Sequence, residues 1–444
     1  MIETISTLSE HGTPSSRGAR ADQRNNHRRL KIAICATHPI QYQAPLWRHL
    51  AQRAGVQVKV FYGSDMSVRG YSDQGFGVTI KWDTPLLEGY DHEFVSTDPR
   101  IQQIGFRSPG CRGLFVRLAK FSPDVVLLTA YSGLFHLGAM FAAHRLGAKI
   151  VMRHEASDVA VARSGSKGLL RDFLLRRLYA RVDRFAAIGH EARQHLRRLG
   201  VTEGRIGASP YCVDSDYLER QWESWSPQRE RLRTELGVPR DGLVLIFSGK
   251  LTAKKNPLLI TAALATLPAA LLGRVHLLVA GDGDLKPAFK RAGRSVLGDR
   301  LHLLGFLNQS EMGRAYAAAD VLVLPSVKGA GETWGLVVNE AMQFRLPVIV
   351  SDGVGCHSDL VAEGKNGFVF RSGDVAGLAA AIRTFSELSS DDRGAFNTGA
   401  LARAAAFSLD AAAIGLESVF ATFATGDNLA RPAGTAPLRG RGGD

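Results

Sequence analysis

Cysteine is scarce in this sequence, and its cysteines form no CxxC pair. The 444 residues contain four thiols, at Cys35, Cys111, Cys212 and Cys356, each far from the next. Zinc-ribbon spacing is therefore absent, and so sparse a set in so long a chain argues against a disulfide framework. The pattern favours a reducing compartment, and we expect a cytoplasmic protein.

Acidic residues are fewer than basic ones. Lys and Arg number 55 against 42 Asp and Glu, which gives a net charge of +13 and favours anionic partners. The basic residues are dispersed and no RNA-binding aromatic motif accompanies them, so we do not expect nucleic acid to be a partner. The N-terminus carries Glu3 and Glu10 without an apolar h-region, and we expect no signal peptide.

Uninterrupted apolar runs of membrane-spanning length are also missing. Residues 125–143 contain no Asp, Glu, Lys or Arg, but Thr129, Tyr131, Ser132 and other polar positions interrupt them. A span needs about 20 consecutive apolar residues. We therefore predict a short strand, a turn and a helix at this place.

Short apolar runs that alternate with helical patterns dominate the remainder. The runs are 31–37, 56–62, 124–129, 148–153 and 183–188 in the first half, and 243–248, 275–280, 301–306, 320–325 and 346–351 in the second. Helical patterns lie between them, for instance at 133–145 and 190–199. This alternation is the signature of parallel α/β sheets. We predict two doubly wound, Rossmann-like domains facing a central cleft.

The domain boundaries follow from breaks in this pattern. We predict disordered tails at 1–29 and 427–444, an N-terminal acceptor-side domain at 30–213, a linker at 214–228, a C-terminal donor domain at 229–407 and a returning helix at 408–426. Both tails are rich in small and polar residues. Ser408 is a suitable N-cap for the last helix.

Loops after three strands of the second half suggest a site for a nucleoside diphosphate. The first carries Lys250, Lys254 and Lys255, whose ammonium groups suit a pyrophosphate. The second begins with Gly281 and Gly283, where the missing β-carbons would permit close approach of the backbone.

The third loop carries two carboxylates, Glu332 and Glu340, eight positions apart. Gly335 lies between them, before the helix that contains Glu340. A carboxylate that accepts two hydrogen bonds suits the diol of a ribose or a hexose.

These motifs, in this order, resemble the donor domain of the retaining glycosyltransferases of family 4, which have the GT-B fold. The resemblance covers residues 249–361 and is weaker in the first half. Its motifs are G-[RK]-L-x-x-x-K at Gly249, Lys250, Leu251 and Lys255; GxG at Gly281 and Gly283; Y-x-x-A-D at Tyr316, Ala319 and Asp320; P-S at Pro325 and Ser326; and E-x7-E at Glu332 and Glu340. Arg345, where the family usually has glycine, and His357 to Asp359 depart from the pattern.

The resemblance implies a role for each matching residue. Lys250 and Lys255 would bind the diphosphate, Glu340 the ribose and Glu332 a sugar hydroxyl, while Gly335, Leu336 and Val337 would offer backbone N–H groups. The family generally needs no metal, so the nucleotide sugar would be a co-substrate and no cofactor is expected. With Lys255 and Glu332, the histidine that often follows a strand of the first domain, here His154, would complete the catalytic group.

Two other features of the first half concern the acceptor. Thr37, His38 and Gln41, after the first strand, could line the cleft on the acceptor side. Residues 163–185 form a basic, apolar helix that fits either an anionic membrane surface or an ordinary core. The family parallel favours the membrane, because many relatives glycosylate lipid-linked acceptors.

We therefore expect a retaining transferase that moves a sugar from a nucleoside-diphosphate sugar to an acceptor hydroxyl. The acceptor would be a saccharide or a lipid-linked saccharide of surface polysaccharide or glycolipid synthesis, at the inner face of the cell membrane. The same architecture also fits a nucleotide-sugar epimerase, or a catalytically silent binding protein.

Overall fold

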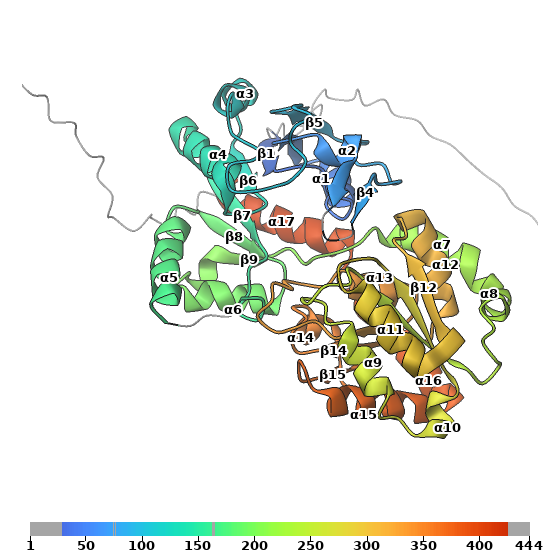
Figure 1. Cartoon of the computed structure of the whole chain (residues 1–444). Helices are drawn as coiled ribbons and strands as arrows, with labels where there is room; N and C mark the ends of the chain where they lie inside the picture. Colours follow the sequence, from blue (N-terminus) through green and yellow to red (C-terminus); the bar gives the residue numbers. More distant parts are fainter. Residues whose placement is uncertain (1–28, 74, 76, 162–164, 425–444) are drawn as a thin grey trace, which may run out of the picture.

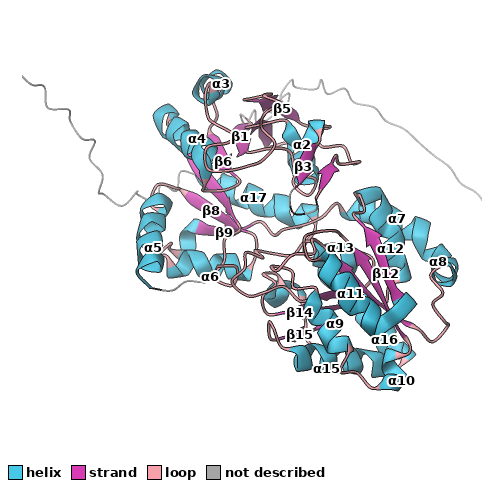
Figure 2. Ribbon diagram, viewed as in Figure 1, coloured by secondary structure: helices cyan, strands magenta, loops and turns pink. Residues whose placement is uncertain are grey.

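The computed structural model of the chain describes residues 29–73, 75, 77–161 and 165–424. Apart from residue 29, the two predicted tails lie outside the described residues. Within them the chain forms two lobes, each built on a sheet flanked by helices (Figure 1 and Figure 2). Both main sheets are parallel, so the predicted fold class of two Rossmann-like domains is confirmed.

The N-terminal lobe contains a seven-stranded sheet in the order β5-β2-β1-β6-β7-β8-β9. Its strands are β1 (Leu30–Ala36), β2 (Val56–Tyr62), β5 (Asp91–Phe94), β6 (Val125–Leu128), β7 (Lys149–His154), β8 (Arg184–Ala187) and β9 (Ile206–Ala208). Alternate side chains of β1 enter different buried clusters, Ile32 and Ile34 one cluster and Ala33 and Cys35 the other. Both faces of the sheet are covered, which explains why its strands read as continuous apolar runs.

Helices from both ends of the chain cover this sheet. They are α1 (Ala44–Ala51), α2 (Met66–Arg69), α3 (Leu114–Phe121), α4 (Gly133–Leu146), α5 (Gly165–Tyr179), α6 (His190–Arg198) and α17 (Leu409–Ala424). The last helix, red in Figure 1, packs on α1 and buries Leu416 and Phe420 in the same cluster as Trp47. Ser408 caps it by accepting a hydrogen bond from the N–H of Ala411 at 3.2 Å. The C-terminal helix thus completes the core of the first lobe.

The C-terminal lobe contains a six-stranded sheet in the order β12-β11-β10-β13-β14-β15. Its strands are β10 (Leu243–Ser248), β11 (Val275–Ala280), β12 (Leu301–Gly305), β13 (Val321–Leu324), β14 (Val348–Ser351) and β15 (Gly367–Phe370). The helices are α7 (Ser215–Trp225), α8 (Arg229–Glu235), α9 (Leu258–Leu264), α10 (Ala269–Leu272), α11 (Lys286–Leu297), α12 (Gln309–Ala318), α13 (Val337–Gln343), α14 (His357–Leu360), α15 (Val375–Glu387) and α16 (Ser390–Ala405). Short 3₁₀ turns occur at Glu203–Arg205, Ser226–Gln228 and Gly298–Arg300.

Each sheet has one point where the strand order reverses. It lies between β1 and β6 in the first lobe and between β10 and β13 in the second. The connections on either side of such a point leave a crevice at the carboxyl ends of the strands, where ligands of open α/β sheets bind. Thr37 and Thr129 follow the two strands of the first crevice, and Gly249 and Ser326 those of the second.

Two segments differ from a simple reading of the sequence. The predicted linker at 214–228 is helix α7 and a 3₁₀ turn, and α7 packs against α12 and α13 of the second lobe. The region between β2 and α3, where no strand is predicted, contains β5 and the hairpin of β3 (Tyr71–Asp73) with β4 (Val78–Ile80). Both contain few consecutive apolar residues, so a pattern of buried strands misses them.

The stretch at 125–143 forms β6 and the buried helix α4, as predicted, and is not a span. Residues 390–423 have the length and hydropathy of a membrane span by composition. They comprise two helices, α16 and α17, with a break at 406–408, and α17 buries its apolar side chains against the first lobe. One third of the most apolar window is buried inside the structure.

Candidate functional site

A cavity of about 440 Å³ lies between the lobes, over the crevice of the second sheet. The second lobe lines it with predicted donor residues, namely Gly249, Gly281, Leu336, Val337 and Glu340. The first lobe contributes side chains that include Gln41, Tyr42, Arg48 and Trp82. Trp82 contacts Phe306 edge to face across the two lobes, with ring centroids 6.4 Å apart. A cavity of this volume is suited to a ligand the size of a nucleotide.

Lys255 and Glu332 form a buried ion pair behind Gly249, and neither residue lines the cavity itself. The Lys255 Nζ lies 2.6 Å from the Glu332 Oε2, and the two side chains are 14% and 8% exposed. A β-carbon placed on Gly249 would lie 3.5 Å from the Lys255 Cε, so the lysine borders a residue of the cavity wall. Ser326 Oγ donates to the same carboxylate at 3.3 Å, and Lys254 Nζ lies 4.0 Å from it.

The charges of this cluster keep Glu332 ionised. Burial alone would raise the pKa of its carboxyl, but Lys255 and Lys254 outweigh that effect and the pKa lies below its ordinary value. Burial lowers the pKa of Lys254; Glu332 opposes this, while the positive charges of Lys255 and Lys250 add to it. Several lysines around one carboxylate leave a surplus of positive charge, which favours an anionic ligand.

Glu340 lies in the first turn of α13 and lines the cavity. Tyr316 on α12 is fully buried and donates from its hydroxyl to Glu340 Oε2 at 2.9 Å. Burial raises the pKa of the Glu340 carboxyl, although hydrogen bonds from Tyr316 and Gln309 act in the opposite direction. The carboxylate is therefore held in one orientation, where it can accept hydrogen bonds from adjacent hydroxyl groups.

Gly281 and Gly283 are needed where two loops meet. A β-carbon on Gly281 would lie 1.9 Å from the carbonyl oxygen of Gly249, and one on Gly283 would lie 2.6 Å from that of Leu251. The N–H of Leu251 also donates to the carbonyl of Asp282 at 2.9 Å. The close approach that we predicted toward a ligand is thus made to the neighbouring loop. Gly281 still lines the cavity, whereas Gly283 is not among its lining residues.

Lys250 points toward the other lobe. Its Nζ donates to both carboxylate oxygens of Asp73, at 2.7 and 2.9 Å, and Asp73 is the last residue of β3. The lysine side chain is 38% exposed, compared with 14% for Lys255. Lys250 therefore joins the two lobes here, and it is not part of the Lys255–Glu332 pair.

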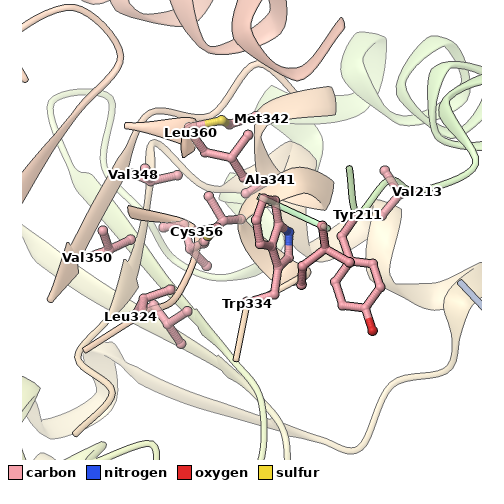
Figure 3. Close-up of a cluster of buried hydrophobic side chains, with 14 of the residues drawn as sticks. Tyr211, Val213, Leu324, Trp334, Ala341, Met342, Val348, Val350, Cys356 and Leu360 are labelled. Carbon is pink, nitrogen blue, oxygen red and sulfur yellow. The ribbon is translucent and has the colours of Figure 1, made fainter. Parts of the chain in front are cut away.

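The loop that carries Glu332 is fixed from both lobes. Trp334 lies next to Tyr211 of the first lobe in Figure 3, with ring centroids 6.0 Å apart. Its Nε1 donates to Asn339 Oδ1 at 2.8 Å, which ties the loop to α13. Gly335 has a φ of +104°, a conformation that favours glycine, and its position would bring a β-carbon within 2.8 Å of Val354 Cγ1. These contacts fix the loop in the conformation that brings Glu332 next to Lys255.

His154 is the last residue of β7 and is almost fully buried. Its ring stacks on His195, with centroids 5.3 Å apart, and on Tyr131 at 6.1 Å. Burial, and then the neighbouring His195, lower the pKa of His154 to about 3, so its imidazole is neutral at physiological pH. It lines a cavity of about 160 Å³ together with Thr333, the neighbour of Glu332. His154 therefore approaches the carboxylate loop across the domain interface.

The three residues predicted on the acceptor side do not line one common cavity. Thr37 lines a separate cavity of about 350 Å³ over the crevice of the first sheet, whereas Gln41 lines the cavity between the lobes. His38 lines none of these cavities; its Nδ1 lies 2.9 Å from Thr37 Oγ1, and burial lowers its pKa to about 4.

The departures from the family pattern have structural explanations. Arg345 has a φ of +60°, in the region that glycine prefers, and its guanidinium lies over the Trp222 ring at 4.2 Å and donates to Glu219 at 2.7 Å. Asp359 accepts hydrogen bonds from the N–H of His190 at 2.9 and 3.0 Å, so it serves the interface between the lobes. Neither residue lines the cavity between the lobes.

Sequence reasoning did not assign several residues that support the site. Tyr316, interpreted as a packing residue, orients Glu340, and Ser326 donates to Glu332. Both residues belong to motifs of the sequence, so their position near the site could be predicted but their hydrogen bonds could not. Asp73 had no signal, because its pairing with Lys250 spans 177 positions in the chain.

Comparisons with known proteins agree with this arrangement. Residues 45–217 match the family model described as Glycosyltransferase Family 4, and residues 228–400 match the one described as Glycosyl transferases group 1. A sulfoquinovosyl transferase of Arabidopsis thaliana is 31% identical over 60% of this chain and 50% of its own length. A D-inositol 3-phosphate glycosyltransferase of Xylanimonas cellulosilytica is 29% identical over 53% and 56%, respectively. The chain thus spans about half the length of the curated relatives it matches.

Solved structures show the same fold over nearly the whole chain. A glycosyltransferase from Rickettsia africae superposes with a TM-score of 0.67 over 90% of this chain and 99% of its own, at 15% identity. Anabaena HepE in complex with UDP superposes with a TM-score of 0.66 over 88% and 100%, at 18% identity.

Proposed function

Since this chain belongs to glycosyltransferase family 4 of the GT-B type, we propose that it transfers a sugar from a nucleoside-diphosphate sugar to an acceptor hydroxyl, with retention of anomeric configuration. One observation carries the proposal. The buried Lys255–Glu332 pair borders Gly249, and Gly249 and Glu340 line one nucleotide-sized cavity at the crevice of the donor-side sheet. A cation for the diphosphate and a carboxylate for the ribose are thus available to one ligand.

The charge of the leaving group determines the roles of the lysines. When the bond between the anomeric carbon and the phosphate oxygen breaks, negative charge grows on the diphosphate, and a preorganised lysine stabilises it. Lys255 lies in the site already, and Lys250 would exchange Asp73 for the diphosphate. With this charge supplied by side chains, we propose that transfer needs no metal, and that chelation by EDTA leaves the rate unchanged.

The proposed retaining course rests on the resemblance to the retaining enzymes of the family. The acceptor oxygen forms its bond to the anomeric carbon on the face that the phosphate leaves, and the acceptor proton passes to the departing phosphate oxygen. Lys255, Lys254 and Ser326 surround the Glu332 carboxylate. We therefore propose that Glu332 accepts a hydrogen bond from a sugar hydroxyl and does not act as a covalent nucleophile. His154, neutral because of its burial, would act as a hydrogen-bonding partner of the sugar and not as an acid.

We also propose that the protein works at the cytoplasmic face of an anionic membrane. Sequence reasoning left a core helix and a membrane-contacting helix open for α5. Four apolar side chains of this helix, Leu169, Leu170, Phe173 and Leu174, are between 53% and 75% exposed, so they do not form a core. Arginines alternate with them, and Arg177 lies over the Phe173 ring at 4.9 Å. Exposed apolar and basic side chains on one helix suit an interface with anionic lipid.

The test of the function is a transfer assay with α-linked UDP-, GDP- and ADP-sugars and a panel of saccharide and lipid-linked acceptors. We expect one donor to yield an α-linked product, identified by NMR. A β-linked product would contradict retention. Conversion of a nucleotide sugar without acceptor would instead support an epimerase, and binding of a nucleotide without any turnover would support a silent binding protein.

A further inference from the structure

The cavity of about 350 Å³ at the crevice of the first sheet has its own chemistry. Thr37 and Thr129, which follow β1 and β6, lie in its wall, with Gln43, His136 and Glu155 around them. On the proposed function this is the place for the acceptor, because it opens at the carboxyl ends of the strands of the acceptor-side lobe. The nature of its walls therefore bears on what the acceptor is.

None of the residues that line this cavity is a lysine or an arginine, and Glu155 is its one carboxylate. His136 adds no positive charge. Its Nδ1 donates to the carbonyl of Ser132 at 3.0 Å, and burial lowers the pKa of its ring despite that hydrogen bond. A phosphate placed here would meet a carboxylate and no cation, which is unfavourable in a partly buried site.

Gln43 also lines the cavity. The residue is 5% exposed, and its Oε1, which is buried from solvent, has no hydrogen-bond partner among the described residues. The Glu155 carboxylate accepts hydrogen bonds and, with the hydroxyl groups of Thr37 and Thr129 in the same wall, suits a ligand that carries hydroxyl groups.

Glu155 lies where this cavity meets the smaller one that contains His154. Both cavities are lined by Ala130, Ser132 and Glu155. The Tyr211 hydroxyl donates to Glu155 Oε2, and the Tyr211 ring is held by the Arg153 guanidinium 4.6 Å from its centroid. A fixed carboxylate thus stands on the path between the acceptor cavity and the carboxylate loop of the donor lobe.

The rim of the cavity is apolar and open to solvent. Ile104 and Phe106 are 39% and 62% exposed. Ile104 and Phe106 are also lining residues. A ligand that reaches from the carboxylate to this rim would be polar at one end and apolar at the other.

We infer that the acceptor is an uncharged hydroxyl compound with an apolar portion, that Glu155 orients its reacting hydroxyl, and that acceptors phosphorylated at the polar end are excluded. The inference rests on the proposed function and deepens it. It also separates this chain from the relatives whose names specify D-inositol 3-phosphate.

The test compares four acceptors with the donor that the protein binds. They are n-octyl β-D-glucopyranoside, D-glucose, D-glucose 6-phosphate and D-inositol 3-phosphate. We expect kcat/KM to decrease in the order octyl glucoside, glucose, phosphorylated compounds, with about tenfold or more between the first and last. Donor binding is measured beforehand by calorimetry. If no nucleoside diphosphate binds, the proposed function fails; if the donor binds and a phosphorylated acceptor is preferred, or none of the four reacts, this inference alone is overturned.

Two substitutions test the residues. Glu155→Gln keeps an acceptor for the Tyr211 hydroxyl and should raise the KM for octyl glucoside about tenfold, while the donor KM stays unchanged and the bias against phosphorylated acceptors weakens. Phe106→Ser should raise the KM for octyl glucoside and leave that for glucose unchanged. Glu235→Gln, a surface carboxylate on α8, is the matched control. Equal acceptor KM values in Glu155→Gln and Glu235→Gln would contradict the role of Glu155.

Discussion

The negative charge of Glu340 is buried, and in the absence of a ligand this charge reduces the stability of the folded protein. The Glu340 carboxyl is buried and its pKa is raised, so folding is less favourable with the carboxyl ionised than with it protonated. For a carboxyl with a raised pKa, the full penalty is present above the folded-state pKa, and stability increases as the pH falls through that value toward the lower pKa of the unfolded chain. Glu340→Gln removes the penalty and keeps an acceptor for the Tyr316 hydroxyl.

We predict that Glu340→Gln has a Tm equal to or above that of the wild type, while nucleotide affinity falls about tenfold or more through loss of a charged hydrogen-bond acceptor. Thermal unfolding and calorimetry measure the two quantities. Glu363→Gln, whose carboxylate accepts from the N–H of Val369 on the surface, is a matched control. A variant that loses stability and keeps its affinity would show that Glu340 serves the fold alone.

The buried histidine predicts a pH dependence of stability. The pKa of His154 is lowered from 6.5 to about 3. The unfolded chain therefore binds a proton that the folded chain does not, and stability is lost as the pH falls below 6.5. At pH 5 this single group accounts for about 2 kcal/mol, at 1.36 kcal/mol for each unit of pKa.

We predict that His154→Gln unfolds with a shallower dependence on pH between 6.5 and 5 than the wild type. The slopes are compared, because the substitution also changes packing at every pH. Denaturant titrations at several pH values provide them. Parallel curves for the two proteins would mean that His154 is charged in the folded state.

At Arg345, the cost of a positive φ is offset by the contacts of the side chain. A non-glycine residue at positive φ costs about 1 kcal/mol relative to glycine. Its stacking on Trp222 and its pairing with Glu219 return a similar amount. We predict that Arg345→Gly changes stability by less than about 1 kcal/mol, whereas Arg345→Ala, which keeps the strain and loses the contacts, is less stable by about 1 to 2 kcal/mol. Urea unfolding of both variants would show the order; equal stabilities would contradict it.

At the scale of elements, helix α5 exposes four large apolar side chains, more than any other helix among the described residues. We predict that the double substitution Leu170→Ser with Phe173→Ser weakens binding to vesicles that contain an anionic phospholipid by about tenfold or more, because two large side chains no longer enter the bilayer. Co-sedimentation measures the effect. Ile414→Ser, an exposed apolar residue of α17, is the control. Binding that is unaffected by the double substitution, or absent in the wild type, would exclude α5 as a membrane contact.

Most elements could be predicted because buried parallel strands leave a strong pattern. The runs at 56–62, 243–248 and 275–280 coincide with β2, β10 and β11. Strands β5, β9 and β15 were missed because they are edge strands of only three or four residues, and β5 consists mostly of polar side chains. The linker prediction at 214–228 mistook a half-exposed helix for a connection, because α7 buries only Leu218 completely.

The site was predictable in part. Lys255 and Glu332 could be found from spaced motifs, since each comes at the end of a strand beside the same crevice. Their contact could not be predicted, because it depends on a loop fixed by Trp334 and Tyr211 from two lobes. The acceptor cavity was harder still. Gln43, Glu155 and Phe106 belong to separate loops, and no local pattern links them.

At the scale of the whole molecule, several contacts hold the two crevices toward each other. Asp73 reaches Lys250, Val161 pairs with Ala330 in a β-bridge, and α17 returns from the second lobe to the core of the first. The site therefore depends on the contact between the lobes, because neither lobe alone supplies both the donor lysines and His154.

The central claim is that Lys255 and Glu340 bind one nucleoside diphosphate at the crevice of the second sheet. Calorimetric titration of the wild type, Lys255→Ala and Glu340→Ala with UDP, GDP and ADP tests it most directly. Lys59→Ala, which removes a 2.9 Å pair with Glu93 at the far edge of the first sheet, is the control. We predict that the wild type and Lys59→Ala bind one of the three nucleotides equally, and that each site variant loses about tenfold or more in affinity. Equal affinity in all four proteins, or no binding to the wild type, would contradict the claim.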